Sequence, residues 1–310
     1  MPNWDDLRYF LAVARTQRVS AAARVLGVEH TTVSRRIRAL EADLDSLLFE
    51  KSRSTGFMLT EDGQRLFVHA EQIESAVDAA RENLSGIGQA LSGHVRIGAT
   101  EGFGSYVLTP LAADFQRRYP HITLDILPVP RFVSLSKREA DLAITIDRPQ
   151  RGPYVCSKLC DYTLRLYGTP GYLAGHAPIR SREDLANHTF IGYVEELVFS
   201  DRLRYLEDLL PDSRVVLRST SVIAQYHAAL QGRSLAILPC FIAAQDARLQ
   251  PVLPDDIAIA RSFWMYCHED LHRLKRISVL WDFMRRSIAR NAGLLAGRSG
   301  EMRYLPQSGN

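Results

Sequence analysis

Near the start of the chain, apolar side chains recur at the spacing of amphipathic helices. A first helix is predicted over residues 4–16. Its apolar face consists of Leu7, Phe10, Leu11 and Ala14. Ser20 is expected to cap a second, short helix over 21–26. Gly27 is expected to end that helix, because glycine suits the left-handed residue that follows a helix.

A third helix is predicted from residues 30–32, whose side chains offer an N-cap, to about Asp43. Its apolar face consists of Val33, Ile37, Leu40 and Leu44. Two helices joined by a tight turn that contains glycine are typical of a helix-turn-helix. Two apolar runs, 47–50 and 57–59, then flank a basic, turn-rich loop over 51–56 and predict a hairpin wing.

The most regular pattern in the chain is a heptad seam that follows Thr60. A cap residue followed by Glu61 and Asp62 predicts a helix start, because acids suit the positive end of the helix dipole. The helix is predicted over 61–91 and would be about 46 Å long at ~1.5 Å per residue. Its apolar positions alternate at intervals of four and three: Leu66, Ala70, Ile73, Val77, Ala80, Leu84, Ile87 and Leu91. Too few residues precede it to cover that length, so we expect it to form a homodimer; packing on its own domain is the alternative.

From His94 onward, predicted strands alternate with predicted helices. The strands are expected at 95–99, 122–129, 141–146, 164–167, 190–194, 215–219, 235–238 and 263–267. The clearest helices are expected at 105–118, 221–231 and 271–291. This alternation predicts an α/β fold with a largely parallel sheet and enough chain for two subdomains. The tail, 298–310, contains Gly, Ser and Pro and is expected to be disordered.

Composition and charge narrow the picture further. No apolar window is long enough to cross a membrane and no secretory signal is evident, so we expect a cytoplasmic protein without membrane contact. The 4 cysteines are too few for a disulfide framework, which agrees with a reducing location. A net charge of +3 over 310 residues says little about nucleic acid. Residues 30–38 alone carry +3, however, which equals the basic excess of the whole chain.

Over residues 4–66 the chain resembles the N-terminal signature of LysR-type transcriptional regulators. The matching stretches are Leu7–Ala14, Ser20–Ala22, Leu26, Thr32–Glu41, Leu48–Phe49 and Leu59–Gly63. Weaker matches follow at Val95–Gly98, Phe115–Pro120, Asp141–Ile144 and Leu235–Pro239. The chain departs from the family pattern at Gln17-Arg18-Val19, where Gly-Ser-Phe is usual. It also departs at Asp45 and Ser234, where glycine is common, and at Lys51, where arginine is usual.

The resemblance implies an N-terminal all-α winged helix-turn-helix followed by an α/β effector domain similar to periplasmic solute-binding proteins. We therefore expect a DNA-binding domain over 1–60, a dimerisation helix over 61–91 and an effector domain over 92–297. Two crossover strands are expected to join two effector subdomains, at about 94–162 with 267–292, and at about 163–266. The implied function is sequence-specific DNA binding modulated by a small-molecule effector. The implied partners are double-stranded promoter DNA, the effector, and further copies of the chain in a homotetramer.

The polar face of the third helix is the candidate DNA reader. Its hydroxyls and guanidinium groups suit phosphates and base edges in the major groove. The candidates are His30, Thr31, Thr32, Ser34, Arg35, Arg36 and Arg38. In the wing, Arg53 is expected in the adjacent minor groove and Lys51 on a phosphate. A solvated polar face is the alternative for the helix, and simple solvation is the alternative for Lys51.

Candidate effector contacts lie beyond the carboxyl ends of the predicted strands, close to helix N-termini. They are Thr100, Glu101, Phe103, Arg131, Thr145, Thr220, Ser221 and His268. Arg131 suits an anionic ligand, whereas Glu101 is unusual beside a site that often takes carboxylates, so a cationic or neutral effector stays open. The competing interpretation of the polar candidates is that their side chains cap helices or stabilise turns. A position in the core is the competing interpretation of Phe103, Phe132 and Phe199.

The sequence gives little support to enzymatic, metal or redox chemistry. It lacks a glycine-rich phosphate loop and a nucleophile elbow, and its histidines are scattered, so no metal or cofactor is expected. Cys156 and Cys160 would lie too far apart in an extended strand for a disulfide, although a loop could bring them together. An α/β enzyme, or a solute-binding protein, with a DNA-binding appendage is the alternative function.

Overall fold

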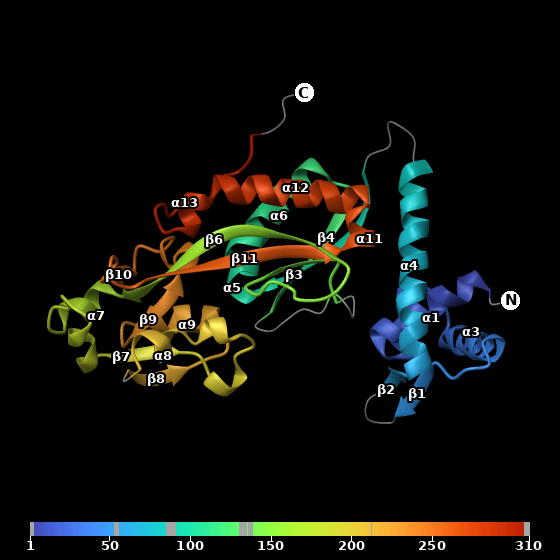
Figure 1. Cartoon of the computed structure of the whole chain (residues 1–310), viewed down its shortest axis with the longest axis horizontal. Helices are drawn as coiled ribbons and strands as arrows, with labels where there is room; N and C mark the ends of the chain where they lie inside the picture. The colour runs from blue at the N-terminus through green and yellow to red at the C-terminus, as the bar shows by residue number, and fades with distance from the viewer. Residues whose placement is uncertain are drawn as a thin grey trace. The chain divides into compact units, whose positions relative to one another are not determined.

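The computed structural model describes residues 3–52, 56–84, 91–129, 135, 139–211 and 213–306. The chain divides into two compact units, Met1–Gln89 and Ala90–Asn310 (Figure 1). Each unit has its own core and is described separately. Among the described residues, no helix combines the length and apolar character that a membrane span needs.

Three helices build the first unit, as their apolar periodicity predicts: α1 (Trp4–Thr16), α2 (Val19–Leu26) and α3 (His30–Asp43). Their apolar faces meet in one cluster in which Phe10, Val13, Val33 and Leu40 are fully buried. Burial of side chains of this size stabilises a fold by roughly 1.5–3 kcal/mol each. The helix-turn-helix therefore rests on its own small core.

Two helix starts differ from the prediction. Helix α2 begins at Val19, so Ser20 lies inside the helix and does not cap it. The carbonyl of Arg18 accepts from the N–H groups of Ala21 and Ala22, which moves the start upstream. Helix α3 likewise begins at His30, with Glu29 at the N-cap and no capping bond from its side chain. The predicted end of α2 is confirmed, because Gly27 takes the left-handed conformation with φ of 66°.

The wing is a two-stranded antiparallel hairpin of β1 (Phe49–Ser52) and β2 (Gly56–Leu59). It is tied to the end of α1, because the N–H of Phe57 donates to the carbonyl of Gln17 at 3.0 Å. That carbonyl would lie 2.5 Å from a Cβ atom on Gly56, whose φ is 80°, so glycine is required there. The turn residues 53–55, including Arg53, lie outside the described residues.

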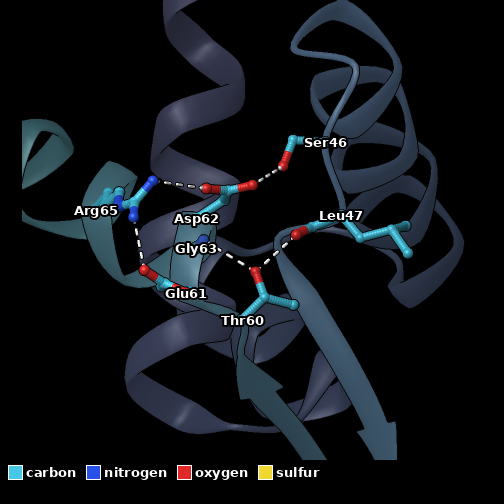
Figure 2. Close-up of polar contacts among 7 residues, drawn as sticks. All are labelled: Ser46, Leu47, Thr60, Glu61, Asp62, Gly63 and Arg65. Atoms are coloured by element: carbon cyan, nitrogen blue, oxygen red, sulfur yellow. Dashed lines mark hydrogen bonds and ion pairs between the residues drawn. The ribbon is translucent and has the colours of Figure 1, made fainter.

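Helix α4 (Glu61–Leu84) begins where the sequence predicts, and Figure 2 shows how its first turn is fixed. The Thr60 hydroxyl accepts from the N–H of Gly63 at 3.0 Å and donates to the carbonyl of Leu47 at 2.6 Å. Ser46 also donates to the Asp62 carboxylate at 2.7 Å. A Cβ on Gly63 would lie 2.1 Å from the Leu48 carbonyl oxygen, so this close approach needs glycine.

The first half of the heptad seam packs within its own unit. Phe67 and Ala70 are buried in the helix-turn-helix core, with Leu66 and Ile73 packed against it. An ion pair of 2.6 Å between Arg15 and Glu74 also ties α1 to α4. The alternative of packing on its own domain is thus correct for Leu66, Ala70 and Ile73.

Further along the same seam, Val77 is 46% exposed and Ala80 is exposed as well. The described part of α4 runs to Leu84, and Ile87 lies outside the described residues. Leu91 is not helical, so the prediction of a helix to residue 91 is wrong at that position. Leu91 lies two residues before the first strand of the second unit, which begins at Gly93.

The second unit is an α/β structure around one sheet in the order β4-β3-β5-β11-β6-β9-β7-β8, with β10 paired to β6. Its strands are β3 (Gly93–Thr100), β4 (Ile122–Val129), β5 (Leu142–Thr145), β6 (Tyr154–Gly168), β7 (Thr189–Gly192), β8 (Arg214–Arg218), β9 (Leu235–Pro239), β10 (Gln250–Val252) and β11 (Ala258–His268). Every predicted strand is present, and β10 was not predicted. The helical and α/β classes of the two units agree with the predicted fold class.

Two long strands, β6 and β11, run side by side and antiparallel through both halves of the second unit (Figure 1). At one end β11 pairs with β5, and at the other end β6 pairs with β9. Parallel pairing is confined to β4-β3-β5 and to β8-β7-β9. The expectation of a largely parallel sheet is therefore wrong for the centre, where only parts of the two long strands had been predicted.

Helices cover the sheet and begin close to strand ends. A continuous helical stretch comprises α5 (Glu101–Phe103), a π-helical turn over Gly104–Leu108 and α6 (Thr109–Arg118). The other α-helices are α7 (Pro170–Ala174), α8 (Tyr205–Leu209), α9 (Val222–Ala229), α10 (Cys240–Ala243), α11 (Glu269–His272), α12 (Lys275–Arg290) and α13 (Ala292–Leu295). The predicted helix over 271–291 is thus split between α11 and α12.

The C-terminal segment is ordered over residues 298–306, contrary to the expectation of disorder. The buried side chain of Asn291 donates to the carbonyl of Arg303 at 2.8 Å and accepts from its N–H at 2.8 Å. Arg118 of α6 also donates to the carbonyl of Leu305 at 2.6 Å. These hydrogen bonds hold a segment that its composition alone predicts to be disordered. Residues 307–310 lie outside the described part.

Candidate DNA-binding face and effector cavity

Helix α3 has a buried side and an exposed polar side. Val33, Ile37 and Leu40 face the core, whereas His30, Thr31, Arg35 and Arg38 are exposed. Thr32 and Ser34 are half-buried between the two sides. Thr31, Arg35 and Arg38 follow one another at intervals of four and three, so they share one face of the helix, and His30 adjoins Thr31 at its start. The predicted DNA-binding candidates of α3 are thus brought onto one surface, with one exception.

The exception is Arg36, which is held by α1. Its guanidinium forms an ion pair of 3.0 Å with Asp6, whose side chain is only 5% exposed, and lies 5.5 Å from the centre of the Tyr9 ring. By contrast, neither Arg35 nor Arg38 has a side-chain hydrogen bond or ion pair with another described residue. Arg36 therefore joins two helices, while the other two arginines remain available to an outside anion.

Of the two wing candidates, the structure describes only the backbone of Lys51. The backbone of Lys51 lies in β1, opposite Phe57 of β2. Arg53 falls in the turn outside the described residues. Both stay predictions as DNA contacts.

A small cavity lies at the carboxyl ends of β3, β5 and β9 in the second unit. Its volume is about 40 Å³. The lining consists of Thr100, Glu101, Gly102, Phe103, Ile146, Tyr162, Leu164, Tyr193, Phe199, Leu203, Tyr205, Thr220, Val222, Pro239, Phe241 and Phe263. Ligands of open α/β sheets bind at this edge, because helix N-termini and strand ends converge there. The cavity is the candidate effector site.

Glu101 connects the two halves of the second unit across this cavity. Its Oε1 atom accepts from the Ser221 hydroxyl at 2.9 Å, and that hydroxyl in turn accepts from the N–H of Ala224 at the start of α9. A second link of 2.9 Å joins Arg202 to Asp147. The Oε2 atom of Glu101 is buried and has no hydrogen-bond partner among the residues that the structure describes.

Aromatic rings form much of the cavity wall. Tyr162 stacks on Phe263 with ring centres 4.4 Å apart, and Phe103 lies 4.4 Å from the same ring. Tyr193 and Tyr205 meet edge to face at 6.0 Å. Burial raises the pKa of both tyrosines, so their hydroxyls remain protonated in neutral solution. The wall is therefore apolar with a few neutral hydroxyl groups.

Four of the predicted effector residues line the cavity: Thr100, Glu101, Phe103 and Thr220. Ser221 lies beside it through its bond to Glu101, and it also caps α9 as the competing interpretation held. Phe199, which was weighed as a core residue, lines the cavity too.

Two predicted effector residues lie away from the cavity. Thr145 is buried, and its hydroxyl donates to the carbonyl of Asp147 at 2.7 Å. His268 caps α11 by accepting from the N–H of Asp270. Because β11 runs antiparallel to β5, its carboxyl end lies at the opposite edge of the sheet, so the structure does not bring His268 to this cavity. Arg131 and Phe132 are outside the described residues.

Most of the aromatic wall was missed in the sequence. Tyr162 and Phe263 lie on the crossing strands, whose pairing was not predicted from the sequence pattern. Tyr193 and Tyr205 lie on connecting segments after β7 and at the start of α8. Ile146 and Pro239 could have been found, since both lie at the carboxyl ends of predicted strands.

The cysteines are in environments that disfavour reactive thiols. Burial raises the pKa of the Cys160 thiol to about 12, and it also raises the pKa of Cys156. Reactive thiols need the opposite shift. Within the described ranges, His, Cys, Asp and Glu side chains form no group that could hold a metal ion.

Two family profiles match the chain. Residues 4–64 match the bacterial regulatory helix-turn-helix protein of the lysR family, and residues 88–289 match the LysR substrate binding domain. The HTH-type transcriptional regulator PtxR of Pseudomonas aeruginosa is 32% identical over 261 residues, which cover 81% of this chain and 82% of the relative. The glycine cleavage system transcriptional activator of Escherichia coli is 26% identical over 283 residues, covering 90% and 91%.

Solved structures show the same architecture. A full-length OxyR variant from Pseudomonas aeruginosa superposes with a TM-score of 0.70 at 21% identity, over 92% of this chain and 98% of that chain. CrgA from Neisseria meningitidis, a LysR-type transcriptional regulator, superposes with a TM-score of 0.56 at 25% identity, over 92% and 99%. At such identity the first likeness concerns the fold alone. The two-unit arrangement of winged helix-turn-helix and two-lobed α/β domain thus occurs in both.

Proposed function

The chain belongs to the LysR family and is a transcriptional regulator rather than an enzyme, and we propose that α3 reads its DNA while the cavity at Glu101 receives its effector. The alternatives of an α/β enzyme or a solute-binding protein with a DNA-binding appendage are set aside on the same grounds. LysR regulators bind DNA and small-molecule effectors. The residues of this chain that bind DNA and the effector are proposed below.

One observation carries the assignment of α3. Arg35 and Arg38 are exposed on a helix whose other side is buried, and neither has an intramolecular partner in the described structure. Free guanidinium groups on a helix that enters the major groove can contact phosphates and the edges of guanine. His30, Thr31, Thr32 and Ser34 extend that face toward the start of the helix. Phosphate contacts of this kind make binding strongly dependent on salt.

The experiment is a DNA-binding measurement with the full-length protein. A duplex from upstream of its own coding sequence and a shuffled duplex of equal composition are compared by fluorescence anisotropy in the same salt. The proposal expects clear preference for the upstream duplex, lost progressively as salt is raised. Equal affinity for both duplexes would argue against sequence-specific recognition at that site.

We propose in addition that the second half of α4 forms a homodimer contact. Val77 and Ala80 continue the heptad seam after the part that packs in its own unit, and both are exposed. An apolar seam in water needs a partner, and a second copy of the same helix offers a matching one. A tetramer would need a further contact between effector domains.

A cytoplasmic location follows for a protein whose target is chromosomal DNA.

Two valines of α4 give a matched test of the dimer. Val77 is on the seam and 46% exposed, whereas Val68 is off the seam and 48% exposed. Val77→Lys should shift the sedimentation profile toward smaller species, because a charge cannot pack in an apolar seam. Val68→Lys should leave the profile as it is. Identical profiles for the two variants would contradict the seam as a dimer contact.

The division of the effector domain is also proposed on structural grounds. We assign residues 94–162 and 267–292 to one subdomain and 163–266 to the other, with β6 and β11 crossing between them. The Glu101–Ser221 and Asp147–Arg202 bonds then join opposite subdomains. Effector binding between the two would stabilise their closed arrangement and so reach the DNA-binding unit.

A further inference from the structure

Among the residues that the structure describes, the lining of the effector cavity includes one acidic side chain and no basic one. Glu101 is the single carboxyl group among the described lining residues, which include no lysine, arginine or histidine. An anionic ligand would lie against this carboxylate at short range in an apolar surrounding, where like charges repel strongly. The described part of the lining therefore disfavours a carboxylate or phosphate ligand.

The state of Glu101 points to a ligand with hydrogen-bond donors. Its Oε1 atom is occupied by Ser221, whereas Oε2 is buried without a partner among the described residues. A buried carboxylate oxygen that lacks a partner costs free energy, because it has lost its water without gaining a donor. An N–H group that enters the cavity would remove that cost.

The aromatic wall of the cavity sets a second requirement for the ligand. Faces and edges of Phe103, Tyr162 and Phe263 pack around the space, and Tyr193 and Tyr205 complete it. Aromatic faces attract cations through their quadrupole, and they also pack well against short hydrocarbon chains. A ligand with a charged head and a small apolar body satisfies both Glu101 and the rings.

Size sets the third requirement. The cavity of about 40 Å³ has room for roughly three water-sized spheres. A ligand of a few heavy atoms therefore suits the space between the two closed lobes. A larger metabolite would have to break the Glu101–Ser221 and Asp147–Arg202 bonds in order to enter.

We propose that the effector of this regulator is a compact protonated amine, with its N–H donated to Oε2 of Glu101 and its hydrocarbon part against the aromatic wall. This assignment rests on the proposed function of the cavity as the effector site. The Ser221 bond to Oε1 stays intact when the amine binds, so the ligand adds a contact to the closed arrangement. Quaternary ammonium ions lack the N–H and are expected to bind less well.

Four probes of similar size separate the ligand classes in calorimetric titrations of the full-length protein. They are propylammonium, 1-propanol, propionate and tetramethylammonium. Propylammonium is expected to bind more tightly than each of the others by about tenfold or more, the scale of one hydrogen bond to a charged group. Binding of propionate at equal or higher affinity would overturn the proposal, as would absence of propylammonium binding.

Two glutamates provide matched variants. Glu101 and Glu269 are each the first residue of a short helix after a strand, but Glu269 is exposed and does not line the cavity. Glu101→Gln should weaken propylammonium by about tenfold or more, while Glu269→Gln should leave it unchanged. Equal effects of the two changes would overturn the proposal. If Glu101→Gln does not fold, the comparison of propylammonium with 1-propanol on the unaltered protein still decides the matter.

DNA affinity, measured with and without propylammonium, separates this inference from the proposed function. If the amine binds through Glu101 and DNA affinity changes, the ligand class and the effector role of the cavity are both supported. If it binds through Glu101 without any effect on DNA, the ligand class stands and the effector role of the cavity fails. If DNA is bound specifically and the amine is not bound at all, the regulator stands and the ligand class fails.

Discussion

Replacement of Arg36 by alanine should destabilise the DNA-binding unit rather than simply remove a DNA contact. Arg36 reaches from α3 to the Asp6 carboxylate at 3.0 Å, and the Asp6 side chain is only 5% exposed. Without Arg36 that buried carboxylate would lose this partner. The sequence places Arg36 in the same polar run as Arg35 and Arg38, so its structural role follows from the contacts alone.

The size of the effect can be worked from those contacts. A hydrogen bond to a charged group contributes roughly 1.5–3 kcal/mol. The Arg36 side chain is 32% exposed, so water screens part of this interaction and the lower half of the range applies. The Tyr9 ring at 5.5 Å adds a smaller cation–π contribution of about 0.5 kcal/mol. We therefore expect a loss of about 2 kcal/mol in the free energy of unfolding of this unit.

Hydrogen exchange of the full-length protein provides the assay. Backbone amides of α1 and α3 should exchange about 30-fold faster in Arg36→Ala, the equivalent of ~2 kcal/mol, with the second unit unchanged. Adding Asp6→Asn should recover part of the loss, because it removes the unpaired charge. Unchanged exchange in Arg36→Ala, together with loss of DNA binding, would refute the structural role and return Arg36 to the DNA-contact face.

Three further changes test the packing and backbone arguments. Gly63→Ala should lower the melting temperature of the first unit, because its Cβ would lie 2.1 Å from a backbone oxygen; Gly171→Ala, which meets nothing within 4 Å, should not. Gln17→Gly should stabilise that unit by about 1 kcal/mol in chemical denaturation, since φ of 55° strains a residue with a Cβ. Asn291→Ala should release the C-terminal segment, so that trypsin cleaves after Arg303 much faster than in the unaltered protein; equal cleavage rates would contradict the tether.

The sequence predicts the helical elements well where local pattern and packing agree. The first three helices follow from apolar periodicity, and the start of α4 follows from the cap at Thr60. The seam of α4 illustrates the limit of such patterns. A heptad repeat indicates that one face of a helix is apolar, but it does not indicate which partner covers each turn of that face. Ala70, for example, packs in the core of its own unit.

The cavity was predicted in part, for a reason that lies in strand direction. Thr100, Glu101 and Thr220 follow from the rule that ligands bind at the carboxyl ends of parallel strands. His268 lies at the other sheet edge because its strand is antiparallel, a property set by pairing between residues far apart in the chain. The aromatic wall depends on the same long-range pairing, which local patterns do not specify.

The departures from the family pattern also become interpretable. Gln17 and Asp45, where glycine is usual, both have left-handed backbone with φ of 55° and 48°. The sequence therefore identified two turns that need this conformation, although the residues there tolerate it less well than glycine does. Backbone strain at these two positions lowers the stability of the first unit locally.

The claim that α3 is the DNA reader is tested most directly by the DNA affinity of Arg35→Ala at physiological salt. The control is Arg285→Ala, which removes an equal charge from an exposed position of α12 in the second unit. A side chain that contacts a base edge contributes ~1–3 kcal/mol, so Arg35→Ala should weaken specific binding by about tenfold or more with unchanged hydrogen exchange. The control should bind as the unaltered protein does. Unchanged affinity of Arg35→Ala for the specific duplex would contradict the assignment of this face.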